Sequence, residues 1–495
     1  MQEKSENVIG GTIMSFKKKL SEQYNEIVKE PEGYEVIEQE ISIKKTHHQL
    51  FKTLKISGIV TASAMATFVV VLCGTFLLSG MHFEESGSKS IRKARFSIYD
   101  TELVKRETFE KLNDIKYTKE KENNPIDESF LNAVNSFTEN SFALLNKSEN
   151  IAYSPLMLYT NLDLVSLASS DEQTTDQFNT VLQIDDRDLR GNNVNHAMRN
   201  NFFVDEQLKS TVQAKNAVFV ERKMGPNPTF LEEITKRNAE AYSLDFQESE
   251  DVANVLRWIN QSVNEDNFMN ESDLKIQSDT AVLYVSSLYF DNAWKNRFEV
   301  EHTNDFYFHL PSGDEIKTKF MNHAYYGNIK TYEKYVEVTD YYNSDYSVTY
   351  YVPIELEDSI YDVLPKNFLN RTDFKNERER MISLSVPKFK ITSENELSKT
   401  VSDMGLSNIY KAGSNHLLNA LNGYWDYSYL TYTKQKTVVS FNEDGTVVKS
   451  IVMSQGNAGK GGHMGNKVTL NRPFVYCIKD SQGLPLVIGN VNDPR

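Results

Sequence analysis

The chain has 495 residues, of which 39% are hydrophobic and 25% are charged. This balance allows a sizeable packed core and excludes a wholly disordered chain. The formal net charge of −15 argues against a nucleic-acid partner, because phosphate backbones attract basic surfaces. The only cysteines are Cys73 and Cys477, so no disulfide framework is expected and the redox compartment stays open.

The first 80 residues divide into a polar tail and an apolar run. Residues 1–55 carry as many acidic as basic side chains and show no strong hydrophobic period, so we expect a solvated tail. Residues 56–79 contain no Asp, Glu, Lys or Arg. As a helix this run would be about 36 Å long, enough to cross a hydrocarbon core of roughly 30 Å. We therefore predict one transmembrane helix at residues 56–80. A buried core helix seldom stays uncharged this long, and a cleaved signal peptide would need a much shorter charged lead.

The charges beside the apolar run indicate its orientation. Lys52 and Lys55 precede it, while Glu84 and Glu85 follow it, which favours a cytoplasmic tail by the positive-inside rule. The rest of the protein would then be extracellular or lumenal and held at the membrane by this single helix. Residues 81–125 are dense in charge and are predicted to form a stalk. N-glycosylation sequons are compatible with this topology, although an Asn-rich chain gives several by chance; they are at Asn146, Asn260, Asn270 and Asn370.

Residues 126–495 combine helix and strand patterns without a regular βαβ alternation, which predicts one α+β domain. Helices are indicated where apolar residues recur at helical spacing or helix formers are concentrated, at residues 130–145, 156–167, 174–182 and 230–242. Strands are indicated where Val, Tyr and Phe are concentrated or alternate, at residues 212–220, 281–289, 346–352, 382–391 and 434–441.

The chain contains no motif of a known catalytic site. It has no G-x-S-x-G elbow and no H-E-x-x-H pair, and Gly459-Lys460-Gly461 lacks the Ser or Thr that follows Lys in a phosphate-binding loop. The nine histidines are scattered, so convergent metal ligands are not expected. We therefore predict a protein that is not an enzyme and that needs no cofactor or metal.

Several short segments occur in an order that resembles the serpin family. They are Ile151–Leu156 (IAYSPL), Asn216–Glu221 (NAVFVE), Leu288–Lys295 (LYFDNAWK), Val386–Ile391 (VPKFKI), Asn442–Val448 (NEDGTVV), Asn471–Phe474 (NRPF) and Gly489–Pro494 (GNVNDP). The resemblance covers residues 126–495. It implies an α+β fold with a large mixed sheet, further sheets, about nine helices and an exposed reactive loop.

The resemblance also implies a function. In inhibitory members a serine protease cleaves the loop, whose first part then enters the large sheet as an extra strand and traps the protease, so the protein acts as a suicide substrate. Counting from Gly445 places the cleaved bond at Lys460–Gly461, where Lys460 suits the pocket of a trypsin-like protease. The alternative for this segment is a solvated Gly-rich loop without a target.

The start of the loop corresponds to the family's hinge, which here comprises Glu443, Gly445, Thr446, Val448 and Ser450. Because side chains alternate in a strand, Thr446, Val448 and Ser450 would share one face and the charged Lys449 would point away from the core. The family prefers smaller residues at the position of Val448. In a slot shaped for Ala, the larger Val448 side chain would reduce the stability of the inserted form by about 1–3 kcal/mol. The hinge is therefore divergent.

A second departure concerns the polar latch between the strands that must part. The matching residues are Ser154, Ser286 and Gln435, which could form a hydrogen-bonded network, while Met157 stands where the family usually has Ser. Two functions stay open at this point. One is a membrane-anchored serine protease inhibitor, and the other is a non-inhibitory serpin-like binding protein at a membrane surface.

Overall fold

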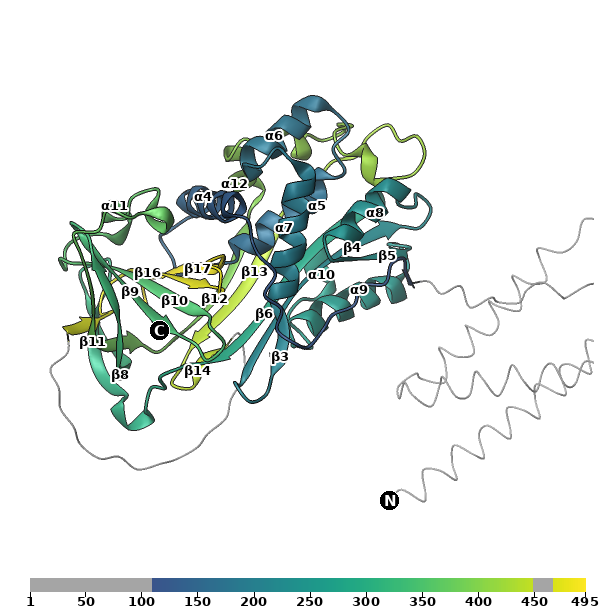
Figure 1. Ribbon diagram of the computed structural model, residues 1–495. Coiled ribbons are helices and arrows are strands. Elements are labelled where there is room, and N and C mark those ends of the chain that lie inside the picture. Colours follow the sequence, from purple (N-terminus) through teal and green to yellow (C-terminus); the bar gives the residue numbers. More distant parts are fainter. Residues whose placement is uncertain (1–108, 448–465) are drawn as a thin grey trace, which may run out of the picture. The chain divides into compact units, whose positions relative to one another are not determined.

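The computed structural model describes residues 109–447 and 466–495, which form two β-sheets with helices packed against them (Figure 1). The tail expected at 1–55 and the transmembrane helix expected at 56–80 lie outside these residues. Among the described residues, none of the helices has both the length and the apolar character needed to cross a membrane.

The described part of the chain contains nine α-helices, in agreement with the expected number. They are α4 (Glu128–Leu144), α5 (Pro155–Ser166), α6 (Glu172–Leu182), α7 (Arg187–Asn200), α8 (Pro228–Lys236), α9 (Ser249–Ser262), α10 (Glu271–Leu274), α11 (Ile360–Val363) and α12 (Ser398–Asp403). Short 3₁₀ turns are η1 (Val300–His302), η2 (Phe368–Asn370), η3 (Asn408–Tyr410) and η4 (Leu418–Ala420). The local sequence determines where several helices begin. The carboxylates of Asp127, Asp171 and Asp186 accept hydrogen bonds from the first backbone N–H groups of α4, α6 and α7, respectively.

The large sheet has eight strands in the order β1-β5-β4-β6-β14-β13-β12, with β3 paired to β4. Its strands are β1 (Glu110–Lys111), β3 (Phe202–Asp205), β4 (Ser210–Glu221), β5 (Ala239–Leu244), β6 (Val282–Ala293), β12 (Phe389–Glu396), β13 (Lys434–Phe441) and β14 (Gly445–Val447). The β4–β5 pair is parallel and the other neighbours are antiparallel, so the sheet is mixed.

The second sheet has nine strands in the order β15-β11-β8-β9-β10-β16-β17-β2, with β7 paired to β8. Its strands are β2 (Ile151–Tyr153), β7 (Asn304–His309), β8 (Glu315–Thr331), β9 (Tyr335–Tyr341), β10 (Ser347–Pro353), β11 (Asn376–Pro387), β15 (Asn466–Thr469), β16 (Phe474–Lys479) and β17 (Pro485–Val491). Strand β17 is fully buried and β16 is buried except at Lys479, as their apolar sequences require.

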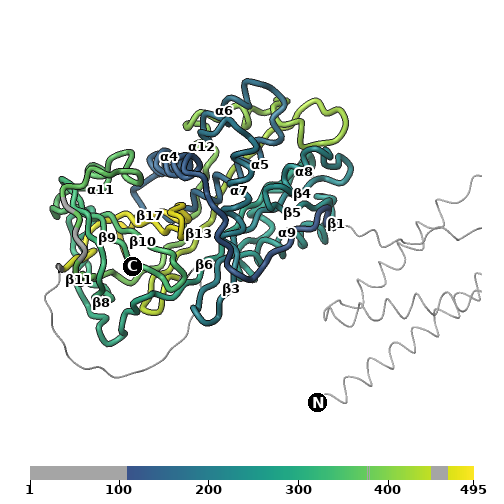
Figure 2. The backbone as a smooth tube through the Cα atoms, viewed as in Figure 1, coloured from purple at the N-terminus to yellow at the C-terminus, as the bar shows by residue number. Residues whose placement is uncertain are grey.

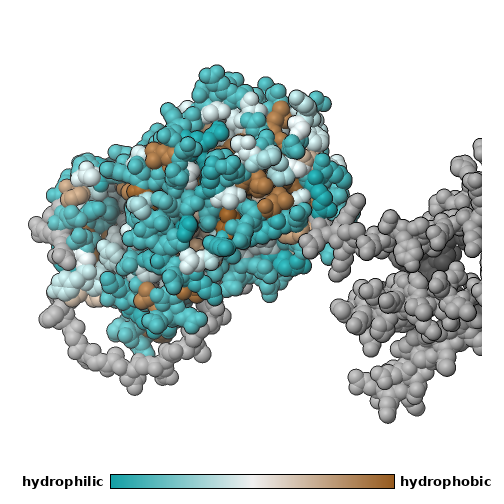
Figure 3. All heavy atoms as spheres, turned by 45° about the vertical axis from the view of Figure 1, so that its right-hand side comes forward, coloured by the Kyte–Doolittle hydropathy of each residue, from teal (hydrophilic) through white to brown (hydrophobic). Residues whose placement is uncertain are grey.

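Alternation along the strands separates the two faces of the large sheet. In β4, Val212, Val218 and Val220 point into the main core, whereas Ala217 and Phe219 lie in a second apolar cluster beneath α9. Helix α5 contributes to the main core and α9 covers the opposite face. On the outside, one view of the surface is mostly hydrophilic with small separate hydrophobic patches (Figure 3).

One predicted helix is shorter than expected. Residues 230–242 were expected to be helical, but α8 ends at Lys236 and Ala239 begins strand β5. Asn238 has a φ of 57°, a left-handed conformation that stops the helix. Parallel pairing of β5 with β4 then outweighs the helix propensity of its Ala and Glu residues.

The folded domain begins before the boundary expected at residue 126. Strand β1 pairs with β5 at the edge of the large sheet (Figure 2), and Phe109 stacks on Tyr242 with ring centroids 4.8 Å apart. The side chain of Lys111 donates a hydrogen bond to Glu240. A two-residue strand with charged side chains has no readable period, so these residues resembled a stalk in the sequence.

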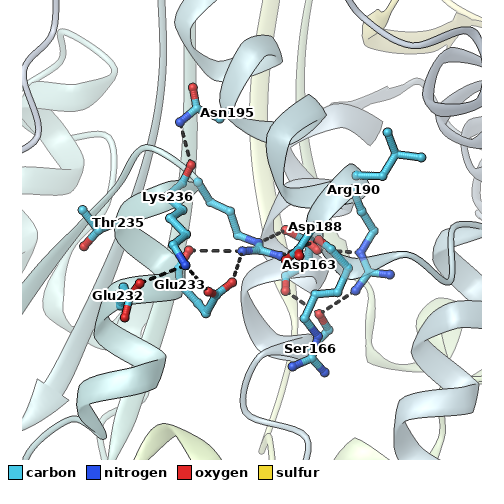
Figure 4. Close-up of polar contacts among 12 residues, drawn as sticks. Asp163, Ser166, Asp188, Arg190, Asn195, Glu232, Glu233, Thr235 and Lys236 are labelled. Carbon is cyan, nitrogen blue, oxygen red and sulfur yellow. Dashed lines mark hydrogen bonds and ion pairs between the residues drawn. The ribbon is translucent and has the colours of Figure 1, made fainter.

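A buried ion cluster fixes the C-terminal half of α5 (Figure 4). The carboxylate of Asp163 accepts hydrogen bonds from Arg190 Nε of α7 at 2.6 Å and from Arg237 Nε, just after α8, at 2.7 Å. Both arginine side chains are 1% exposed and Asp163 is 0% exposed. Arg190 also donates to Ser166 and Arg237 to Glu233, so two acidic groups balance two basic ones. The cluster therefore ties three helices together without an unpaired charge.

Candidate functional site

The large sheet is parted between β6 and β13. Strand β14 separates them at one end, but it is paired with each of them over only two or three residues. In the described part of the chain, no ladder joins β6 to β13 beyond that point. A cavity of about 430 Å³ lies there, lined by Val282–Leu288 of β6 and by Lys434–Val438 of β13. Among the described residues, the gap thus leaves backbone N–H and C=O groups of both strands without a neighbouring strand.

A tight turn connects β13 to β14 and places β14 at the end of this gap. The side-chain oxygen of Asn442 accepts hydrogen bonds from the backbone N–H groups of Asp444 and Gly445, at 2.9 and 3.2 Å. The indole N–H of Trp294 donates to the Asn442 carbonyl at 2.8 Å. A Cβ atom on Gly445 would lie 2.1 Å from the carbonyl oxygen of Asn292, so only glycine allows β14 to pair here.

Glu443 anchors the turn to Lys388, which immediately precedes β12, and to Thr303, which follows η1. Lys388 Nζ donates to its carboxylate at 2.8 Å and Thr303 Oγ1 donates at 3.1 Å. Burial favours the neutral acid, but the hydrogen bonds outweigh that effect and lower the pKa of Glu443 below its ordinary value. The adjacent Asp444 forms an ion pair with Arg297 at 2.8 Å. Because both side chains are half exposed, this ion pair contributes little to the stability of the fold.

Thr446 points into the core between the two sheets. It is 0% exposed, and its hydroxyl lies 2.6 Å from the hydroxyl of Tyr342. The Tyr342 ring stacks on Trp294 with centroids 4.6 Å apart. Burial raises the pKa of Tyr342 well above its ordinary value, so this hydroxyl stays neutral and can donate to Thr446.

The candidate latch residues Ser286 and Gln435 occupy the same level of the sheet on opposite sides of the gap. Thr446 pairs with Asn292 on one side and with Phe441 on the other. Ser286 stands six residues before Asn292, and Gln435 stands six residues before Phe441. An extended strand continuing β14 would therefore pass between them at one position.

Two further amides extend this level into a polar row across the sheet. Asn216 of β4 pairs with Ser286, and Asn395 of β12 pairs with Gln435. Residues two positions along a strand share a face, and Val218, two residues after Asn216, lies in the main core, so the row is on the face of the sheet that α5 covers. The row is thus continuous except at the gap.

The structure brings two of the three latch residues together. Gln435 accepts a hydrogen bond from the Ser154 N–H at 2.8 Å and donates to the Ser154 carbonyl at 3.0 Å, while the Ser154 hydroxyl donates to Leu486. Ser286 does not join them. It accepts a hydrogen bond from the side-chain amide of Asn161 at 3.2 Å. Asn161 lies two turns after Ser154 on the same face of α5, a spacing that could have indicated its role.

Four other predicted site residues, Val448, Ser450, Lys460 and Gly461, lie outside the described residues. Sequence reasoning missed the partners of the hinge, namely Trp294, Tyr342 and Lys388, because they come from distant parts of the chain. Within the part of the chain that the structure describes, no cluster of His, Cys, Asp and Glu is arranged to hold a metal ion. The described site therefore offers strand edges and hydrogen-bonding groups.

Comparison with known proteins gives consistent matches. Residues 132–494 match the family model described as Serpin (serine protease inhibitor). Alpha-1-antitrypsin 1-5 of Mus musculus is 24% identical over 367 residues, which cover 70% of this chain and 84% of that protein. Leukocyte elastase inhibitor of Xenopus tropicalis is 26% identical over 378 residues, covering 71% of this chain and 96% of that protein. The crystal structure of the thermophilic serpin Tengpin in its native state superposes with a TM-score of 0.64 at 23% identity, covering 77% of this chain and 97% of Tengpin.

Proposed function

The chain belongs to the serpin family, and on this premise we propose that it inhibits a serine protease as a suicide substrate whose cleaved loop enters the large sheet. Membership of the family agrees with the α+β fold predicted from the sequence motifs. Serpins as a family are protease inhibitors and not catalysts. The observation that carries the mechanism is the gap between β6 and β13, which begins where β14 ends.

The register of β14 specifies how the loop would fill the gap. Val447 pairs with Asp291 of β6, so a continuing strand would bring Val448 opposite Phe290 and Gly456 opposite Val282. Each new backbone hydrogen bond would add about 0.5–1.5 kcal/mol to the stability of the inserted form. Val448, Ser450 and Val452 would face the core, as Thr446 does, and Lys449 would face away from it.

Lys460–Gly461 is our proposed cleavage site, and a trypsin-like serine protease is the proposed target. Counting from Gly445 places this bond at the family's scissile position, and Lys460 is the basic residue there. The loop would be cut after the segment 448–456, so the whole of that segment would remain attached to β14 and be free to enter the sheet.

We further propose that residues 56–80 anchor the protein in a membrane, with the domain extracellular or lumenal. Of the sequons, Asn146 is exposed, whereas Asn260 is 9% exposed and its amide donates to the carbonyls of Asp266 and Met269. A lumenal domain should therefore carry a glycan at Asn146 and none at Asn260. Glycosylation of a sequon engineered into residues 1–55 would show that the tail is lumenal and would contradict this topology.

The direct test of inhibition is a covalent complex that survives denaturation. The protein is incubated with trypsin and separated on a denaturing gel, where we expect a band at the summed mass and loss of trypsin activity. Trypsin lacking its nucleophilic serine is the control and should give no such band. If every trypsin-like protease tested only cleaves the loop, inhibition is excluded and the alternative of a non-inhibitory binding protein at the membrane surface is favoured.

A further inference from the structure

We propose that residues 109–126 form a strap that clasps one edge of the large sheet to the second sheet and opens as a single unit. The strap runs from β1 to the start of α4 (Figure 2). It lies before residue 132, where the match to the family model begins. This inference is independent of the proposed function, and its test uses neither the reactive loop nor a protease.

The first part of the strap completes the outer edge of the large sheet. Strand β1 pairs with β5, and the backbone N–H of Leu112 donates to the carbonyl of Ala241 at 2.8 Å. The side chain of Asn113 then takes the place of a strand. Its amide donates to the carbonyl of Ala239 and its oxygen accepts a hydrogen bond from the Ala241 N–H, both at 2.9 Å. The strap thus supplies hydrogen-bond partners along β5, whose other side pairs with β4.

The middle of the strap packs on the two strands beyond β5. The ring of Tyr117 stacks on that of Phe202, the first residue of β3, with centroids 4.4 Å apart. The ammonium group of Lys215 of β4 lies 5.5 Å from the centroid of each ring, within the range of a cation–π contact. The backbone N–H of Val204 on β3 also donates to the carbonyl of Lys119 at 3.0 Å. These contacts hold the strap against β3 and β4.

The strap continues onto α7, the helix that precedes β3. Arg199 donates two hydrogen bonds to the carboxylate of Glu122, at 2.8 and 2.9 Å, and these lower the pKa of Glu122 below its ordinary value. The backbone N–H of Asn124 donates to the side-chain oxygen of Asn200 at 2.7 Å, and the Asn200 amide donates to the Asn124 carbonyl at 2.8 Å. Two residues of the strap are therefore fixed to consecutive residues of one helix.

Two turns of the second sheet hold the last part of the strap. Lys121 Nζ donates to the carbonyl of Ser344, in the turn between β9 and β10, at 2.6 Å. The side-chain amide of Gln482, in the turn between β16 and β17, donates to the Asn124 carbonyl at 2.7 Å. The oxygen of Gln482 accepts a hydrogen bond from the Ile126 N–H at 3.0 Å. The strap therefore links β5, β4 and β3 of the large sheet to β9–β10 and β16–β17 of the second sheet.

The contacts of the strap are too closely spaced for its parts to separate. Only residues 114–116 lie between the contacts of Asn113 and Tyr117, and the side chains of Asp114 and Lys116 are 80% and 85% exposed. A stretch of three residues spans at most about 11 Å when fully extended. Displacing the strap from β3 would thus strain its pairing with β5, and the reverse also holds. The two sets of contacts should therefore open together.

The strap joins the large sheet far from the hinge. Strand β1 meets β5 at the level of Val220 on β4, which pairs with Val282 of β6. The hinge residue Thr446 pairs with Asn292 of β6. Ten residues of β6 separate these two levels, which is about 33 Å along an extended strand. Opening of the strap should therefore leave the hinge unchanged.

Hydrogen exchange of backbone amides in the full chain tests whether the strap opens as a unit. Tyr117→Ala removes the stack on β3 and should make the amides of 110–112 and 239–243 exchange about fivefold faster than in wild type, the effect expected for one lost aromatic contact. Asn113→Ala removes two hydrogen bonds to β5 and should speed exchange in 202–204 by a similar factor. Each variant thus perturbs one strand and is measured on the other. The amides of 445–447 should not change in either variant.

Tyr326→Ala is the matched control, because Tyr326 of β8 is 71% exposed, and it should leave all these amides unchanged. Faster exchange confined to the strand that each variant contacts would overturn the inference, as would unchanged exchange in both variants. Equal acceleration throughout the domain, including 445–447, would also overturn it, because the strap would then open only with global unfolding. Asn113→Ala alters a partly exposed side chain, so it decides the question if Tyr117→Ala does not fold.

Discussion

Ser286 and Gln435 face each other across the gap at one level of the large sheet, yet each is hydrogen-bonded to a different residue of α5. In the sequence they were expected to form one latch with Ser154. Among the described residues, the two strands are joined only through β14, and a cavity of about 430 Å³ lies beyond it. The position of the hinge above this space connects the local hydrogen bonds to the proposed function.

The contact between Tyr342 and Thr446 should stabilise the start of the hinge. Tyr342→Phe removes a buried hydroxyl that lies 2.6 Å from that of Thr446, and Thr446→Val removes the other partner. Each single change should lower the free energy of unfolding by about 1–3 kcal/mol, because a buried polar group loses its partner. Urea unfolding of both single variants and the double variant measures the interaction.

The double variant should lower the free energy of unfolding by less than the sum of the two single changes, and the difference, the interaction energy, should be about 1 kcal/mol. Tyr307→Phe is a suitable control, because Tyr307 is 53% exposed, and it should change the free energy by less than about 0.5 kcal/mol. Strict additivity of the two hinge changes would show that the hydroxyls do not interact.

Glu443 should make stability depend on pH. The hydrogen bonds from Lys388 and Thr303 lower its pKa in the folded state, so its stabilising effect is complete above the ordinary pKa and is lost as pH falls through the folded value. Wild type should therefore exceed Glu443→Gln in unfolding free energy at pH 7. The difference should decline between about pH 5 and 3.

Thermal or urea unfolding across this pH range is the measurement. Glu301→Gln replaces an exposed carboxylate on η1 and is the control, which should differ from wild type at pH 7 by less than about 0.5 kcal/mol in unfolding free energy. A difference for Glu443→Gln that grew as the pH fell would contradict the assigned role of Lys388.

The buried cluster around Asp163 should be essential for stability. Asp163→Asn removes the charge that both Arg190 and Arg237 contact, leaving two buried cations with Glu233 alone. We expect a loss of about 3–5 kcal/mol in the free energy of unfolding, measured in urea. Asp188→Asn changes an exposed carboxylate of α7 in the same region and should cost less than about 0.5 kcal/mol. Equal effects of the two substitutions would contradict the account of the cluster.

Lys460–Gly461 should be the first bond cut by a small amount of trypsin. The prediction follows from the position of Lys460 between glycines in the segment that links β14 to β15 and from its suitability for a trypsin-like pocket. Mass spectrometry of the first fragments identifies the bond, and Lys460→Gln should abolish that fragment pair. A first cut at another bond in wild type would reject the assignment.

The family and some of the main elements, such as α4, α5, α6, β4, β6, β10 and β13, could be predicted from the sequence, because motifs such as Val386–Ile391 and the apolar periods are local. Strand β5 was mistaken for helix because Ala and Glu favour helices and only pairing with β4 makes the segment extended. Asp163, Arg190 and Arg237 were not singled out in the sequence, since burial by distant helices leaves no sign in the local pattern. For the same reason the partners of the hinge were missed.

The strands that part were indicated only by the resemblance to the serpin family, and nothing in the local sequence of β6 and β13 shows a gap. Residues of β6 and β13 have the composition of ordinary central strands, and a missing neighbour leaves no trace in either sequence. The gap is evident only in the strand pairing, whose register places Ser286 and Gln435 at one level on its two sides.

The most direct measurement of the central claim is the melting temperature of the protein before and after cleavage of Lys460–Gly461. If residues 448–456 enter between β6 and β13, they add ladder hydrogen bonds and apolar burial, so the cleaved protein should melt well above the intact one. Thr446 is already buried in the intact protein, so the test uses Ser450→Arg, which would bury an unpaired charge only after the segment has entered the sheet and should abolish the increase. A cleaved wild-type protein that melts at or below the intact one would contradict the account.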